Sequence, residues 1–592
     1  MNILNLKKER LICLLISVVL LFSVISVLSA SINGSGSRIL SVRWIPAVCL
    51  VLAVAYLLYD RKLGFFSKLK IKASEVWNRR REDGAGARLH HRITVCATLC
   101  LALLYVVLLA TSHISKFSIL LVYALSVAVL VLQLTYRIIH DDGSSPSQLF
   151  ICVTLILGIA MAYSLPFCSW LSWDDEFHFG RVYDISHFSF GKTDPFAVFR
   201  MKDGTVAYTI QDFMADPNAF STQMLRDMQF EVPTWHRVDN PVTAIGNLPT
   251  IFSMMLLNLF GADIIKIVII GRMAATVAYA FIIGAGIKRM KSGGYLFSAV
   301  CLLPCTLFLA SVYSYDYWLT AWIAYSFAYF ISEMQCPEKK IVKKDMICLL
   351  GSMMLACLVK QVYFFLFIPF FLLPNSKFED PAKAKKFRRT CLILMLVLVV
   401  VFLAPMIIRQ SDGSDMRGGA DVSASGQVKY ILSHPFEYLK TLWKFVAFYV
   451  SAPQFIEFSN MYAYITLRTG GLNAIWATFS LVLLLYAAFT DRSEKILLKN
   501  KNWIYTVGFL SCLLQVCLIA TSLYVAFTPV GHNTVLGCQF RYFFPVMLPL
   551  LYFMVPSSLV STVREKAQKT IIFGGLSFAL IGTFIEVYLC KL

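Results

Sequence analysis

Residues 149–168 read LFICVTLILGIAMAYSLPFC and contain no charged side chain. An α-helix needs about 20 apolar residues to cross the hydrocarbon core of a bilayer. Directly after this run the chain continues as SWLSWDDEFHFGR, from Ser169 to Arg181, with three consecutive acids. An uncharged run that ends in an acidic cluster predicts a membrane-spanning helix that places carboxylates at the membrane surface.

The composition of the whole chain extends this prediction. Its 592 residues are 58% hydrophobic and only 15% charged, and the mean hydropathy is +0.68. Ordinary soluble proteins are roughly 45–50% apolar and about 25% charged. The composition excludes a secreted domain, a cytosolic enzyme and a nucleic-acid binder, and it predicts an all-α, polytopic membrane protein.

Hydrophobic runs predict about fifteen transmembrane helices. The first run, up to Ala30, is too long for the apolar part of a signal peptide, so we expect an uncleaved first span. The expected spans are 11–30, 42–59, 93–111, 117–137, 149–168, 264–287, 295–312, 317–333, 345–359, 362–374, 391–408, 473–490, 503–526, 541–560 and 570–589.

The net charge of +20 is explained by loops held on the cytoplasmic side. The N-terminus is basic, and the connection 60–92 carries ten Lys and Arg residues. Alternation of the spans then places every later basic loop on that same side, and the loops 169–263 and 409–472 outside. It also requires that 242–260 lies in the interface and that 345–374 forms two short spans turning at Lys360-Gln361. The segment 441–460, broken by Pro453, is likewise expected to lie in the interface.

Two units are expected: a four-helix extension, 1–145, with the basic cytoplasmic loop 60–92, and a core, 146–592. The extension has hardly any intramembrane charge, whereas the core is rich in polar residues. Most of the 16 cysteines lie in apolar runs, and there is no CxxC pair. A structural disulfide is not expected, and Cys168 and Cys538 are the one pair predicted near the same outer surface.

The outer loop 169–240 holds eleven Asp and Glu residues against six Lys and Arg residues. Asp174, Asp175 and Glu176 repel one another at a membrane surface, which suits a general base, ligands for a divalent cation such as Mg or Mn, or both. The alternative is an acidic N-cap of a helix that starts at Glu176.

Further polar residues fall at membrane level. Arg272 lies roughly two turns inside the sixth span, and an intramembrane Arg is a functional candidate; the alternative is a snorkelling side chain. Asp316, Lys360 and Arg541 fall at the outer ends of later spans, where each alone could be an interfacial anchor. Acids above several cations favour a substrate with an anionic head and a lipid tail, such as a lipid phosphate.

Five separated pieces of 149–560 resemble the bacterial membrane family named domain of unknown function 2142. They are two acids before His178-Phe179-Gly180-Arg181, Ser314 with Asp316, Lys360 with Tyr363, His434-Pro435, and Gly537-x-Gln539-x-Arg541-Tyr542-Phe543-x-Pro545. The family's acidic pair matches Asp174 and Asp175, and Glu176 is an extra acid here. Residues 1–145 lie outside the resemblance.

The resemblance implies a GT-C glycosyltransferase fold and a polyprenyl-phosphate sugar as donor. It implies that Asp174, Asp175 or Glu176 acts as general base in an inverting transfer to a cell-envelope glycan or glycolipid. Trp170 and Trp173 could stack on a sugar, although an interfacial aromatic belt explains them as well. The substrate-binding candidates are His178, Arg181, Arg272, Asp316, Lys360, Gln539, Arg541 and Tyr542.

Three alternatives stay open at this point. They are a flippase or transporter for a lipid-linked saccharide, a polymerase or ligase for such saccharides, and a non-catalytic partner of an envelope assembly complex. A transporter typically has broken helices near the bilayer midplane and an internal repeat, whereas the charges here fall at the outer surface. We therefore expect an enzyme in the bacterial cytoplasmic membrane, with its active site outside and no nucleic-acid partner.

Overall fold

The computed structural model describes residues 84–112, 114–140, 143–168, 171–188, 200–201, 228–229, 241–408, 421–450, 459–468, 474–492, 498, 500–556, 561 and 563–589. The regular elements in these residues are helices, apart from β1 (Arg200–Met201) and β2 (Met228–Gln229), which form a short antiparallel pair of two residues each. The expected spans 11–30 and 42–59 and most of the loop 60–92 lie outside the described residues.

The N-terminal half contains α4 (Gly84–Thr111), α5 (Lys116–Ile139), α6 (Pro146–Ser164), α7 (Asp175–Ser186), η2 (Pro241–Asn247), α10 (Leu248–Leu259), α11 (Ile264–Arg289), α12 (Gly294–Cys301), α13 (Pro304–Ala310) and α14 (Asp316–Gln335). Local sequence sets several of these boundaries. At the start of α6, for example, Ser145 and Gln148 form a capping box around Pro146, a residue well suited to the first turn.

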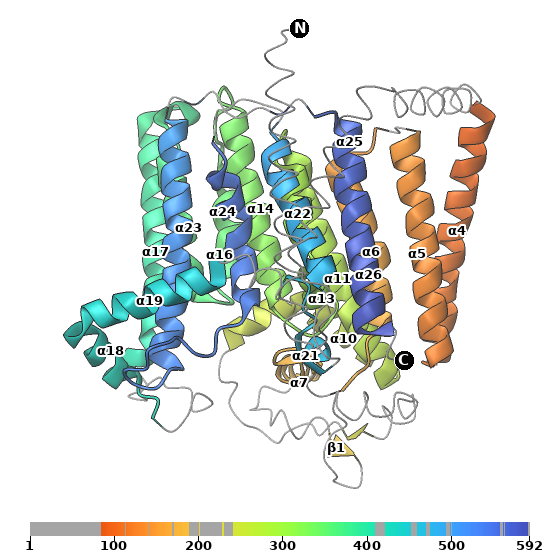
Figure 1. The fold of residues 1–592 in the computed structure, drawn as a ribbon, viewed down its shortest axis with the longest axis horizontal. Helices are drawn as coiled ribbons and strands as arrows, with labels where there is room; N and C mark the ends of the chain where they lie inside the picture. The colour runs from red at the N-terminus through yellow and green to blue at the C-terminus, as the bar shows by residue number, and fades with distance from the viewer. Residues whose placement is uncertain are drawn as a thin grey trace, which may run out of the picture.

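The C-terminal half contains α15 (Lys343–Met346), η3 (Ile347–Gly351), α16 (Ser352–Cys357), η4 (Gln361–Leu372), η5 (Asn375–Lys377), α17 (Pro381–Ile408), α18 (Ala424–Ser433), α19 (Pro435–Val450), α21 (Ala463–Arg468), α22 (Ala474–Thr490), α23 (Lys501–Ala526), η7 (Phe540–Phe543), α24 (Phe544–Met554), α25 (Glu565–Lys569), η8 (Thr570–Gly574) and α26 (Gly575–Val587). Figure 1 shows the long helices side by side, with α7, α18 and α19 lying across their lower ends.

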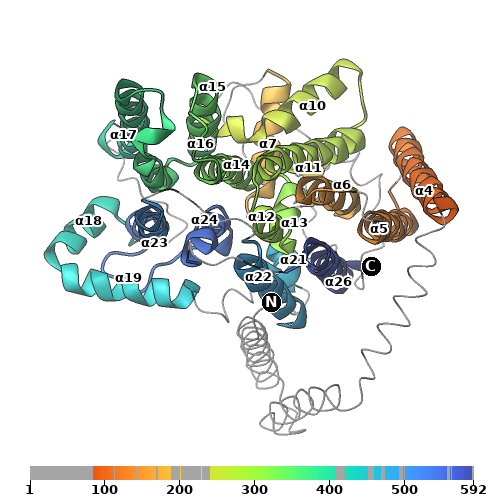
Figure 2. The ribbon, with the colours of Figure 1, turned by 90° about the horizontal axis from the view of Figure 1, so that it is seen from above.

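Six of these helical runs are long and apolar enough to cross a membrane: Ala87–Thr111, Lys116–Ile139, Pro146–Ser164, Ile264–Arg289, Lys501–Ala526 and Glu565–Val587. The all-α membrane class is therefore confirmed, and the count of fifteen spans stays a prediction. The expected span 295–312 is formed by two short helices, because Pro304 starts α13 after a break. Every residue of α12 and α13 is buried, and Figure 2 shows them amid the other helices, with α4 at the edge.

The basic segments meet at one end of the bundle, called the basic end below. Arg289 at the end of α11 lies 2.8 Å from Glu333 near the end of α14. Lys377, between η4 and α17, lies 3.1 Å from the same carboxylate. Asn500, before α23, donates to the Leu372 carbonyl at the end of η4. Alternation of the spans predicts that the basic loops lie at one shared end, and these contacts agree with it. The assignment of this end to the cytoplasm stays a prediction.

Three segments that were expected to be interfacial or broken can be compared with the structure. The helix α10 has a length of about 18 Å at 1.5 Å per residue, too short for a core of about 30 Å. Its Thr250 contacts the Gly271 carbonyl, early in α11. The run 345–374 breaks between α16 and η4 at Lys360, as expected. The helix α19 covers part of the expected interfacial segment 441–460.

Candidate functional site

Four segments far apart in sequence meet at the end of the bundle opposite the basic end. Arg541, in η7, is their common partner and is 4% exposed. Its Nη2 donates to Asp174 Oδ2 at 3.0 Å, and its Nη1 donates to Asp316 Oδ2 at 2.9 Å. Nη1 also donates to the Trp173 carbonyl at 3.2 Å. We call Asp174, Asp316, Lys360, Arg541 and Tyr542 the Arg541 cluster.

Asp316 is the buried acid of this cluster, with 3% exposure. It begins α14, and the Ser314 hydroxyl donates to its Oδ2 at 3.0 Å. The Asp316 backbone N–H donates back to Ser314 Oγ, also at 3.0 Å. A buried carboxylate requires such partners, so Ser314 and Arg541 together fix its position.

The neighbouring acids Asp174 and Asp175 have different surroundings. Asp174 adopts left-handed backbone angles, with φ of 59°, and its side chain is 36% exposed. Asp175 is fully buried, and its Oδ1 accepts the Tyr313 backbone N–H at 2.7 Å. The helix α7 begins at Asp175, and Asp174 occupies the N-cap position without a side-chain capping hydrogen bond. The acids thus lie at the N-terminus of α7, as the N-cap alternative expects, and that alternative leaves only the contact of Asp174 with Arg541 to be explained.

Glu176 lies in α7, but its side chain falls outside the described residues. Among the described residues, no group of three His, Cys, Asp or Glu side chains gathers around a possible metal position. The two described acids instead face an arginine and a backbone amide. A divalent cation, Mg or Mn, thus stays an untested expectation, and the residues described do not form a site that fits it.

Arg272 does not lie in the Arg541 cluster. It is 1% exposed, and it donates to the carbonyls of Leu165 and Pro166 at 2.9 and 3.0 Å. Its Nη2 lies 3.9 Å from Asp175 Oδ2. This Arg ties the end of α6 to Asp175, so we assign it to positioning the acidic loop.

Lys360 occupies the turn between α16 and η4, where it is half-buried. Its Nζ lies 3.4 Å from the centre of the Tyr542 ring. The hydroxyl of Tyr363 donates to the Tyr542 carbonyl at 2.7 Å, which holds that residue in place. Burial lowers the pKa of Lys360 to about 8, although the nearby Asp316 carboxylate acts in the opposite direction.

Other residues expected in the site lie around the cluster. His178 is 6% exposed, and its ring contacts Tyr315 edge-on with centroids 4.6 Å apart. Burial lowers the pKa of His178 to about 4, against the effect of Asp174 and Asp316, so its imidazole is neutral at pH 7. Arg181 lies in the same helix. Gln539 precedes η7, and its buried Oε1 has no hydrogen-bond partner within the described part of the chain.

Some residues singled out in the sequence make no contact with the Arg541 cluster within the described residues, and two residues near the cluster were not predicted. His434 is exposed and stacks on Tyr430, and Trp170 lies outside the described residues. Cys168 and Cys538 do not form a disulfide with each other. The sequence did not indicate Tyr313 and Tyr315. The Tyr313 backbone N–H donates to Asp175, and the Tyr315 ring makes the edge contact with His178. Their only sequence signal was proximity to Ser314 and Asp316.

A backbone constraint supports the segment that leads to Arg541. Gly537 has φ of +75°, and an added Cβ would lie 2.4 Å from the Phe527 ring. We expect Gly537→Ala to lower the unfolding free energy by about 1–2 kcal/mol through backbone strain, with about 1–3 kcal/mol more from the clash. Thermal unfolding of the purified protein measures this loss. Gly143→Ala is the matched control, because Gly143 has φ of +74° and open space around it; equal losses in both variants would contradict the clash.

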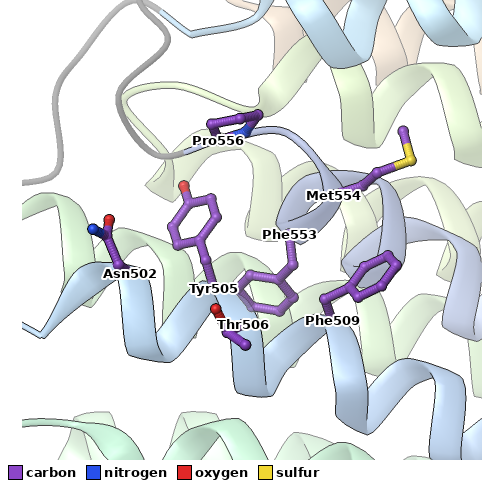
Figure 3. Close-up of a pocket in the computed structure, with 7 residues that line it drawn as sticks. All are labelled: Asn502, Tyr505, Thr506, Phe509, Phe553, Met554 and Pro556. Carbon is purple, nitrogen blue, oxygen red and sulfur yellow. The ribbon is translucent and has the colours of Figure 1, made fainter.

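The structure also contains a cavity of about 450 Å³ away from this cluster. Figure 3 shows Asn502, Tyr505, Thr506, Phe509, Phe553, Met554 and Pro556 around it. These residues belong to the start of α23 and the end of α24, at the basic end. No lining residue is a carboxylate or a cation, so the Arg541 cluster is the better candidate for chemistry.

Comparison with known proteins gives one match. A family model described as "Predicted membrane protein (DUF2142)" matches residues 155–550, which include the whole Arg541 cluster. No curated protein and no solved structure gives a significant match.

Proposed function

The chain belongs to the DUF2142 family of predicted membrane proteins, and on this premise we propose that it is a membrane glycosyltransferase with the Arg541 cluster as its active site. The donor is a polyprenyl-phosphate sugar, and the acceptor is an extracytoplasmic cell-envelope polysaccharide or glycolipid. The fold is of the GT-C type, and the protein lies in the bacterial cytoplasmic membrane with its N-terminus inside.

One observation carries the proposal. A partly exposed carboxylate, Asp174, is held by a buried arginine at the end of the bundle opposite the basic end. Glycosyl transfer to a hydroxyl requires a base for the acceptor proton and positive charge near the leaving phosphate. Asp174 supplies the first, and a cation within the same cluster supplies the second. The position at the helix ends suits a donor whose lipid chain stays in the bilayer.

The proposed step is a single displacement. The acceptor oxygen attacks the anomeric carbon, and its proton passes to the Asp174 carboxylate. As the new carbon–oxygen bond forms, the bond from the anomeric carbon to the phosphate oxygen breaks, and the lipid phosphate leaves with the electron pair. Attack from the face opposite the leaving group inverts the configuration of the sugar.

The remaining residues orient the substrates in this proposal. The unpartnered Oε1 of Gln539 can accept a hydrogen bond from a sugar hydroxyl. The neutral imidazole of His178 and the guanidinium of Arg181 flank the acidic loop from α7. Asp316 fixes Arg541, and Arg272 fixes Asp175, so both act through other residues.

Transfer of labelled sugar from polyprenyl-phosphate donors in membranes tests the proposal. Membranes containing the wild-type chain should form a labelled glycan or glycolipid that membranes without the chain do not form. Absence of product with every donor, together with movement of a fluorescent lipid-linked saccharide between leaflets, would overturn the proposal in favour of a flippase. A product elongated by whole saccharide blocks would indicate a polymerase.

A further inference from the structure

We propose that Lys360 is the cation that binds the phosphate of the lipid-linked donor, an inference that rests on the proposed glycosyl transfer. The inference distinguishes among three cations, Arg272, Lys360 and Arg541, that the sequence alone leaves equivalent. It also makes donor binding depend on the protonation of one side chain.

Arg541 and Arg272 are already engaged with the protein. Both terminal nitrogens of Arg541 donate to carboxylates, one to Asp174 and one to Asp316. A phosphate that approached Arg541 would face these two negative charges and be repelled. Arg272 is 1% exposed and donates to two backbone carbonyls. Within the described residues the Nε of each guanidinium has no hydrogen-bond partner, but it is buried, so both arginines offer an approaching anion less than Lys360 does.

Lys360 differs because, among the residues that the structure describes, its ammonium has no oxygen partner. Within the described part of the chain it makes no hydrogen bond and no ion pair, and its contact is with the face of the Tyr542 ring at 3.4 Å. A ring face attracts a cation, but it cannot accept hydrogen bonds from all three N–H groups of the Lys360 ammonium. A phosphate oxygen would provide charge-assisted hydrogen bonds for the rest.

The surroundings hold this ammonium in place. Lys360 sits at the break between α16 and η4 with extended backbone angles. Tyr542 is fixed through the hydrogen bond from Tyr363 to its carbonyl and follows Arg541 directly in η7. The cation therefore lies in the same cluster as the proposed catalytic base, where Asp316 and Asp174 act on it electrostatically but form no ion pair with it within the described residues.

Donor binding should then depend on pH in a defined direction. Burial lowers the pKa of Lys360 to about 8, so the side chain is largely charged at pH 7 and loses its proton above pH 8. A bound phosphate favours the charged form, so binding above pH 8 requires proton uptake, and affinity falls as the pH rises. The titratable and charged groups that act on Lys360 are Asp174, Asp316, Cys538 and Arg541, and its ring partner is Tyr542.

The test is binding of polyprenyl phosphate to the full chain in lipid nanodiscs, compared with polyprenol and with inorganic phosphate. We expect polyprenyl phosphate to bind more tightly than either, with affinity falling about tenfold per pH unit above pH 8. A phosphate monoester has its second pKa near 6, so the ligand is almost fully ionised above pH 8 and does not itself titrate in this range.

Variants separate phosphate binding from a structural role. Lys360→Met should weaken binding of polyprenyl phosphate about 10- to 100-fold, leave polyprenol binding unchanged and remove the pH dependence. Lys360→Arg should bind polyprenyl phosphate without the loss above pH 8, because guanidinium does not titrate there. Lys266→Met is the matched control: Lys266 is half-buried in the first turn of α11, at the same end of the bundle, and we expect no change.

Wild-type affinity that stays constant from pH 7 to pH 10, or full affinity in Lys360→Met, would overturn the inference. Competition by inorganic phosphate as strong as by polyprenyl phosphate would identify a free-phosphate site and overturn the lipid assignment. If Lys360→Met does not fold, the pH profile of Lys360→Arg decides alone. Failure of the glycosyl-transfer proposal looks different, because sugar transfer would be absent while the Lys360-dependent binding persists.

Discussion

Replacement of Asp174 by Asn should lower the rate of sugar transfer by about 10²- to 10⁴-fold, the range typical of a lost general base. An amide cannot accept the proton of the acceptor hydroxyl, and it also removes the charge that Arg541 contacts at 3.0 Å. Turnover of labelled donor by purified protein, at saturating donor, measures the effect. The amount of folded protein should stay close to that of the wild type, because the side chain is 36% exposed.

Asn is the informative substitution for a backbone reason. Asp174 has φ of 59°, and Asn adopts this left-handed conformation readily, whereas Ala does not. The Asn variant therefore removes the carboxylate without adding backbone strain. Asp174→Glu restores a carboxylate and should recover part of the activity. More than a tenth of wild-type turnover in Asp174→Asn would remove Asp174 from the role of base and transfer it to Glu176 or another group.

Arg272→Met should have the largest effect on stability, a loss of about 3–5 kcal/mol in the free energy of unfolding. The substitution leaves a fully buried carboxylate, Asp175, without its nearby cation, and it leaves the Leu165 and Pro166 carbonyls without their donor. We expect a much lower apparent unfolding temperature in detergent. Transfer activity should fall with the folded fraction, because Arg272 holds the acidic loop.

A double variant tests the cause of this loss. Arg272→Met combined with Asp175→Asn removes both buried charges, so it should be more stable than Arg272→Met alone. Arg272→Lys should rescue little, because an ammonium cannot reproduce the fork that reaches two carbonyls. Wild-type unfolding behaviour in Arg272→Met, or no gain in the double variant, would contradict the positioning role of Arg272.

Together the two predictions distinguish neighbouring acids that the sequence presents as a pair. Asp174 and Asp175 are adjacent, yet one meets solvent and Arg541 while the other is buried against Tyr313 and Arg272. Removing the Asp174 carboxylate should remove most of the activity and leave stability close to that of the wild type. Removing Arg272, the cation beside Asp175, should lower stability. A flippase makes no glycosidic bond, so it would show no loss of sugar transfer that depends on Asp174.

Much of the architecture could be predicted from the sequence because it depends on local composition. Uncharged runs of sufficient length specify helices in lipid, and the all-α membrane class follows directly. The break at Lys360 and the shortness of α10 followed from the requirement that basic loops share one end. The same count of spans placed Asp316, Lys360 and Arg541 at the end that holds Asp174.

The roles of individual residues could not be predicted in this way. A span count fixes the end of the bundle at which a residue lies, but it does not fix lateral neighbours. Arg541 contacts an acid that is 367 positions away along the chain, and which acid it contacts depends on how the helices pack. The sequence suggested that Arg272 binds an anion. In the structure its guanidinium instead donates hydrogen bonds to the carbonyls at the end of α6.

By itself, the sequence determined that this protein is an all-helical membrane protein, that it carries acids after a long apolar run, and that its lysines and arginines cluster between spans. Those properties depend on the hydrophobicity and charge added up over short segments of the chain. The free energy of transferring a segment into lipid depends on the same totals. Only the tertiary structure decided which acid is partly exposed and which cations are already paired. Pairing and burial are set by distances of a few ångströms between distant segments, because charges in a low-dielectric interior interact strongly only with the partners that packing brings to them.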